Sequence, residues 1–150
     1  MINENLQTVM TKIEAMLNDT NHNKAVETVL NRLVSFGYEP VEDDVFPIAY
    51  AIQKVYNHIK NQTNQNTVPD GLFEVYVDMI CGEFLYSKYL AGTLTMENLD
   101  FEGIVKSVSE GDTSVTFETS GQDEDKFNKL IRWMIDGKGC DLLCYRKMQW

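Results

Sequence analysis

The sequence predicts a mainly α-helical protein, a helical bundle of four to five helices with one protruding β-hairpin at about 103–118 and an extended C-terminal tail. Apolar residues recur every three to four positions along most of the chain, which is the spacing of one helix face. Only the stretch GIVKSVSEGDTSVTFE alternates apolar and polar residues around a Gly-Asp pair, as strands of a hairpin do. The residues at 140–150 fit neither pattern and end on an aromatic side chain.

Chain length and composition predict one soluble domain over residues 1–150. A domain of this size buries enough surface to fold without disulfides, and 43% apolar and 24% charged residues are ordinary for a globular protein. No apolar run approaches the roughly 20 residues of a membrane span, and the N-terminus lacks the basic region and apolar core of a secretory signal. We therefore expect no membrane association and a cytosolic origin.

The N-terminal part, 1–18, is predicted as a helix. Its apolar residues include Leu6, Val9, Ile13 and Leu17, which fall on one helical face.

The helical core, 22–94, is predicted to hold three helices. The first ends at Gly37, since glycine is the natural residue just beyond a helix C-terminus. Asp43 or Asp44 caps the second, and Pro47 lies in its first turn, where a missing N–H costs nothing.

A polar stretch, NQTNQNT at 61–67, is predicted as the linker to the last core helix. That helix starts at Pro69 and Asp70 and runs to about Leu90. It is apolar around most of its circumference, which is typical of a buried central helix.

The hairpin prediction at 103–118 depends on Gly111 and Asp112, which suit a tight type I′ or II′ turn. Side chains alternate between the two faces of a strand. A lone two-stranded hairpin is marginal in water and leaves both edges unpaired. It therefore either lies on its own helices or pairs with another subunit. One face carries Ile104, Val108, Val115 and Phe117, and Val105 is the only apolar residue of the other.

After the hairpin, a helix is predicted at 122–136, with an acidic first turn favourably placed at its positive N-terminal end. The tail at 140–150 then carries residue types that are enriched in interface cores. Either this tail contacts a partner or Trp150 folds back onto the core. The apolar and aromatic tail residues are Leu142, Leu143, Tyr145, Met148 and Trp150, of which Tyr145, Met148 and Trp150 are of the enriched types.

Charge is distributed unevenly along the chain, whose formal net charge is −10. The segment 97–125 has nine acidic residues against one Lys, a net of −8, whereas 126–150 has six basic residues against two Asp, a net of +4. This polarity is either solvated surface charge or the basis of head-to-tail association between copies.

No constellation for catalysis or metal binding is found in the sequence. The two histidines, His22 and His58, lie in helical or turn context without a paired nucleophile. Cys140 and Cys144 are four apart but lack a nearby histidine, and Cys81 lies in an apolar run typical of a buried thiol. We expect no catalytic residues, no metal site and no cofactor, and hence no enzyme.

The order of these parts resembles the head–tail connector proteins (adaptor, or head-completion, proteins) of tailed bacteriophages and prophages. The matching pieces are PDGL at 69–72, VYVDMICGEFLYSKYLAGTL at 75–94, IVKSVSEGDTSVTF at 104–117 and LLCYRKMQW at 142–150. The resemblance covers roughly residues 25–150. Its most specific piece is SVSEGDTSVTF combined with the ending Tyr-Arg-Lys-x-x-Trp.

This resemblance implies a structural virion protein that forms an oligomeric ring under the capsid portal, connects head to tail and extends the DNA channel. The implied partners are the portal protein, a neck, stopper or tail-completion protein, and further copies of the chain. Double-stranded DNA would pass without sequence-specific binding. The implied location is the head–tail interface of the virion, and the host cytoplasm during assembly. A free subunit can be monomeric, because such interface elements often order only on assembly.

Residue by residue, the resemblance assigns the hairpin to intersubunit contacts and the tail to portal docking. The hairpin contacts are Ile104, Val105, Val108, Val115 and Phe117, and the tail contacts are Tyr145, Arg146, Lys147, Met148 and Trp150.

The alternative is a small prophage-encoded helical protein-binding module, such as a regulator or a tail-assembly chaperone. That alternative predicts a monomer or dimer that binds a protein or peptide and never forms a ring.

Overall fold

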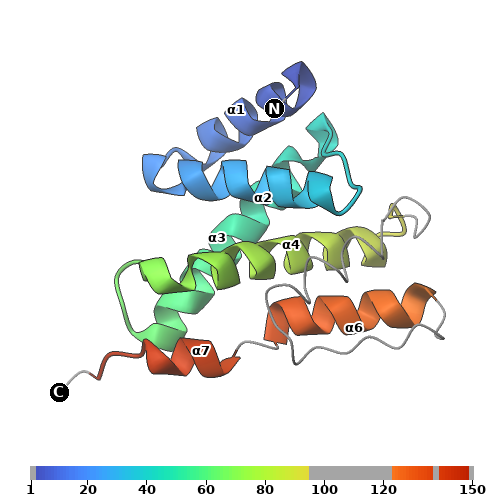
Figure 1. Ribbon diagram of the computed structural model, residues 1–150. Coiled ribbons are helices and arrows are strands. Elements are labelled where there is room, and N and C mark those ends of the chain that lie inside the picture. The colour runs from blue at the N-terminus through green and yellow to red at the C-terminus, as the bar shows by residue number, and fades with distance from the viewer. Residues whose placement is uncertain (1–2, 95–122, 137–138, 149–150) are drawn as a thin grey trace.

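The computed structural model describes residues 3–94, 123–136 and 139–148 (Figure 1). Within these ranges the chain forms six α-helices and three short 3₁₀ helices, and it has no strands. The prediction of a mainly helical fold is therefore confirmed. The predicted hairpin at 103–118, with all of its contact residues, lies outside the described residues.

The first two helices are joined by a tight turn. Helix α1 (Glu4–Leu17) begins at Asn3, whose side chain accepts a hydrogen bond of 2.8 Å from the Leu6 N–H, and it ends at Asn18 in the left-handed conformation. The 3₁₀ helix η1 (Thr20–His22) then leads into α2 (Asn23–Ser35). Two polar residues therefore determine this turn: Asn18 tolerates the left-handed backbone, and the Asp19 side chain caps η1.

Helix α3 (Val45–Thr63) follows the 3₁₀ helix η2 (Glu42–Asp44) and runs further than the sequence predicts. The prediction of a linker from residue 61 is wrong for 61–63. Thr63 is fully buried, and its hydroxyl donates a hydrogen bond of 2.7 Å to the Ile59 carbonyl. The helix ends only at Asn64, which adopts the left-handed conformation.

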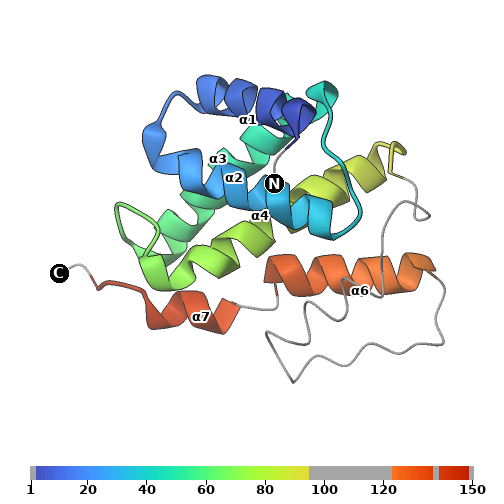
Figure 2. The ribbon, with the colours of Figure 1, turned by 45° about the horizontal axis from the view of Figure 1, so that its top comes forward.

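Helix α4 (Phe73–Leu90) is the central helix, as its all-round apolar sequence predicts. Every residue from Val75 to Cys81 is buried, because α4 packs against α2, α3 and α6 (Figures 1 and 2). The chain at Asp70–Leu72, where the sequence predicts the helix start, forms instead the 3₁₀ turn η3.

Helix α6 (Asp123–Asp136) lies along α4 in both views (Figures 1 and 2). Gly82 of α4 allows the close approach, since a Cβ there would lie 3.0 Å from the Met134 Cβ. The Tyr89 and Phe127 rings meet further along, with centroids 5.0 Å apart. The buried residues of α6 are Phe127, Leu130, Ile131 and Met134.

Helix α7 (Gly139–Cys144) occupies the first part of the predicted tail and packs against α3. The prediction of an extended tail is therefore wrong for 140–144. Leu142 is buried, and one helical turn satisfies backbone hydrogen bonds while that side chain reaches the core. Of the tail residues that the structure describes, 145–148 lie outside the helix.

Candidate functional site

The described part of the tail lies against the joint between α3 and α4, and its main chain is bonded there. The Lys147 N–H donates a hydrogen bond of 2.8 Å to the Thr63 carbonyl. The Asn64 Nδ2 donates one of 3.0 Å to the Lys147 carbonyl, and the Gln65 Nε2 donates another to the Tyr145 carbonyl. Three hydrogen bonds therefore fix the direction in which the chain leaves α7.

The Tyr145 side chain lies directly over Gly71, at the start of η3. A Cβ added at Gly71 would collide with the Tyr145 hydroxyl and lie 2.7 Å from the ring carbon that bears it. This contact uses the absence of a side chain at Gly71, whose φ is not in the left-handed region. The glycine is therefore a packing requirement of the tail.

The side chains of the tail face solvent although its main chain is held. Met148 is 73% exposed and Leu143 is 61% exposed, while Tyr145 is 39% exposed. Arg146 and Lys147 are also exposed and add two positive charges. The result is a strip of cationic and apolar side chains, chemistry that suits a protein surface carrying acidic and apolar groups.

Four of the five predicted docking residues, those at 145–148, therefore lie together in one strip. Trp150 lies outside the described residues. The sequence predicts a tail that extends from the body, whereas the described part lies on the body. The donors that hold it come from the polar stretch NQTNQNT, which sequence reasoning treated only as a linker.

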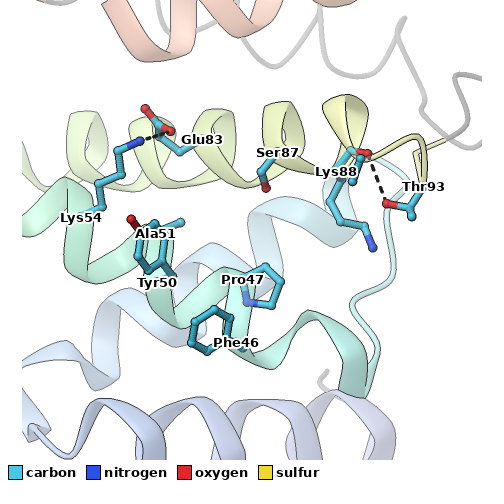
Figure 3. Close-up of a pocket in the computed structure, with 10 residues that line it drawn as sticks. Phe46, Pro47, Tyr50, Ala51, Lys54, Glu83, Ser87, Lys88 and Thr93 are labelled. Atoms are coloured by element: carbon cyan, nitrogen blue, oxygen red, sulfur yellow. Dashed lines mark hydrogen bonds and ion pairs between the residues drawn. The ribbon is translucent and has the colours of Figure 1, made fainter.

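A second candidate surface is a hollow of about 420 Å³ between α3 and α4 (Figure 3). Phe46 and Tyr50 of α3 stand beside it, 64% and 61% exposed, with their rings stacked at 6.1 Å between centroids. The opposite wall includes Ser87 of α4 and Ala91, the residue just after that helix. Sequence reasoning missed this surface, although Phe46 and Tyr50 are four apart and fall off the predicted inner face of their helix.

The charges around this hollow are paired across it. Lys54 contacts Glu83 at 3.1 Å, which links α3 to α4 (Figure 3), and Lys88 contacts the buried Asp44 at 3.0 Å. Its described lining residues include no histidine or cysteine. The hollow therefore offers an exposed aromatic surface of the kind that contacts another protein.

His22 lies in a further hollow of about 560 Å³, at the start of α2. Burial lowers the pKa of His22 below its usual 6.5, against the opposing effect of Asp19. Its ring meets Tyr56 edge-on at 4.7 Å, and its Nδ1 lies 3.5 Å from the Tyr76 hydroxyl, whose pKa is raised by burial. His22 and Tyr76 are therefore two neutral side chains packed in an aromatic cluster, an arrangement typical of a protein core.

The structure also shows the exposure of two other residues that the sequence analysis considered, His58 and Cys81. His58 is exposed and Cys81 is fully buried, as predicted, and burial raises the pKa of the Cys81 thiol. Within the described ranges, no cluster of three or more His, Cys, Asp or Glu side chains could hold a metal ion. Among the helices described, none is long and apolar enough to span a membrane.

Comparisons of this chain with protein-family models, with curated proteins and with solved structures find no match.

Proposed function

We propose that this protein is a structural virion protein of a tailed phage or prophage, a head–tail connector that forms a ring under the capsid portal. In this role it joins head to tail and extends the channel through which double-stranded DNA passes. It binds the portal protein on one side and a neck, stopper or tail-completion protein on the other. The support is the order of sequence motifs together with a helical body that carries a bound C-terminal strip.

The exposed strip at 145–148 is the observation that carries the proposal. It combines Arg146 and Lys147 with the apolar groups of Tyr145 and Met148, and its main chain is already fixed. A prearranged segment loses less conformational entropy on binding than a free one. Such a strip is suited to docking on a portal surface with acidic and apolar groups.

The ring itself requires contacts between copies, and we assign these to the β-hairpin expected at 103–118. In this proposal the apolar hairpin face pairs with a neighbouring subunit, which removes the unpaired edges of an isolated hairpin. A head-to-tail contact repeated around an axis closes into a ring. The contributing residues would be Ile104, Val105, Val108, Val115 and Phe117.

Portal binding tests this function. Purified portal rings encoded in the same genome would be immobilised, and the affinity of the chain would be measured by interferometry. The double variant Arg146→Ala, Lys147→Ala should bind at least about tenfold more weakly, a loss of about 1.4 kcal/mol. It keeps the main-chain hydrogen bonds of Lys147, so it changes only the exposed side chains.

A charge-matched control is available on α6, where Lys129 and Arg132 are also exposed. The double variant Lys129→Ala, Arg132→Ala removes the same two charges and should bind the portal within a factor of about two of the parent. If both double variants lost the same portal affinity, the contribution of the tail would be a nonspecific effect of charge. Absence of binding by the parent chain would contradict the connector function.

The hollow beside Phe46 and Tyr50 favours a second candidate, a helical protein-binding module. Two large, stacked aromatic side chains at over 60% exposure are unusual on a surface with no partner. That function predicts a monomer or dimer that does not bind portal rings and that binds its partner protein or peptide through this hollow. The variant Phe46→Ser, Tyr50→Ser would then abolish partner binding, whereas portal binding by the connector tail would survive it.

A further inference from the structure

We propose that Thr63, Asn64, Gln65 and Gly71 form a receptor for the chain's own C-terminal tail and act as positioning residues for its contact with the portal. We call these four residues the tail cradle. The positioning part of this proposal rests on the proposed function, whereas the holding part rests on the contacts alone. It gives a role to the Asn/Gln stretch at the end of α3.

The cradle uses atoms that the end of a helix leaves without partners. The last four carbonyls of an α-helix have no partner within the helix. Thr63 is the last residue of α3, and its carbonyl accepts the Lys147 N–H at 2.8 Å. The tail therefore satisfies a carbonyl of a residue whose side chain is fully buried.

Asn64 serves the cradle in two ways. Its backbone is left-handed, with φ of 53°, a conformation that asparagine tolerates better than most residues. Its side chain then donates to the Lys147 carbonyl at 3.0 Å. Lys147 thus has both of its main-chain groups bonded, one to Thr63 and one to Asn64.

Gln65 and Gly71 hold Tyr145, which lies two residues before Lys147. The Gln65 side-chain amide donates to the Tyr145 carbonyl, and the Tyr145 ring lies where a side chain at Gly71 would stand. The contacts to the carbonyl and ring of Tyr145, together with those to both main-chain groups of Lys147, define the position and the direction of the tail. All are made from one short segment, so the segment and the tail fit each other as a site and its ligand.

The cradle grips the main chain and leaves the side chains of 146–148 in solvent. A held main chain with exposed side chains suits a segment that binds a partner, because the partner recognises the side chains. Fixing the main chain in advance lowers the entropy lost on docking. The occupant is the tail of the same chain, as its bonding shows.

Two kinds of variant release the tail by different means. The double variant Asn64→Gly, Gln65→Ala removes both amide donors, and glycine keeps the left-handed backbone at residue 64. The single variant Gly71→Ala leaves the amides in place and displaces the Tyr145 ring. Gln62→Ala is the matched control, since Gln62 is an exposed amide of the same stretch.

The first readout needs no portal protein. Hydrogen exchange of the Lys147 amide, measured by NMR on the full chain, should speed up at least about tenfold in both release variants and stay unchanged in Gln62→Ala. Unchanged exchange in the release variants would overturn the cradle. Dimers that exchange tails, detected by sedimentation, would overturn the assignment of the occupant.

The second readout is portal affinity, which should fall at least about threefold in both release variants and stay unchanged in Gln62→Ala. Faster exchange with unchanged affinity would overturn the positioning role while keeping the cradle. If the parent chain fails to bind the portal, the proposed function and the positioning role fall together, and the exchange result still decides the cradle.

Discussion

His22 illustrates how burial controls a single residue. It is 3% exposed, and desolvation lowers its pKa from 6.5, with Lys60 acting in the same direction and Asp19 against it. The unfolded chain therefore binds a proton at a higher pH than the folded chain does. The stability that neutral His22 contributes is full above 6.5 and is lost as the pH falls below it.

This pH dependence can be isolated with His22→Gln. Between pH of about 7.5 and about 5.5, the free energy of unfolding of the parent should fall more than that of the variant, because only the parent must charge a buried imidazole. Urea unfolding at the two pH values measures the difference. Parallel losses in both proteins would show that His22 titrates alike in the folded and unfolded chains.

Contacts between residues that are near in sequence could be predicted from the sequence, whereas contacts between residues that are far apart in sequence could not. Asp44 stands at the N-cap position of α3, as predicted, but its side chain makes no capping hydrogen bond to that helix. Its carboxylate instead accepts a hydrogen bond of 3.0 Å from the N–H of Val41, the residue that precedes η2. It also accepts one of 2.7 Å from the Tyr38 hydroxyl and pairs with Lys88. The Lys88 contact joins segments far apart in sequence, and no short-range pattern encodes it.

At the scale of elements, the contact between α4 and α6 depends on one small residue. Gly82 lies in the buried middle of α4, and a Cβ there would lie 3.0 Å from the Met134 Cβ and 3.1 Å from the Ile135 Cγ1. Met134 Cβ belongs to the rigid start of its side chain, so it cannot rotate away. Larger side chains must push the two helices apart.

We expect Gly82→Val to lower the free energy of unfolding by about 1–3 kcal/mol through overpacking. Chemical denaturation measures this loss. The control Ser87→Val places the same β-branched residue at an exposed position of the same helix. There the change in helix propensity and the loss of the 2.7 Å hydrogen bond from the Ser87 hydroxyl to the Phe84 carbonyl should together cost less than about 1 kcal/mol. Equal costs at the two positions would mean that α6 does not press on α4 at Gly82.

Helix periodicity predicted most elements, but it placed the end of α3 too early and missed α7, for physical reasons. The run to Thr63 looks polar in sequence, yet Thr63 can be buried because its hydroxyl bonds to the Ile59 carbonyl. Helix α7 is too short for a periodic pattern, and the burial of Leu142 against the core helps to stabilise it. Both misses come from packing that overrides local polarity.

The position of the C-terminal tail is a feature of the whole molecule, because it depends on contacts between distant parts of the chain. The tail returns to the joint between α3 and α4, so that Tyr145 meets Gly71 and Lys147 meets Thr63. The family resemblance assigned portal docking to the tail residues, but no sequence pattern predicted that their main chain is held on the body. The charge polarity of the chain, net −8 over 97–125 and +4 over 126–150, remains consistent with association between copies.

Electron microscopy of negatively stained portal rings mixed with this chain tests the connector function most directly. The full chain should add density that caps one end of the ring, and a chain ending at Cys144 should leave the portal bare. Bare portals in both samples, with the chain monomeric on its own, would contradict the connector function. Density that persists after truncation would contradict the docking role of the tail.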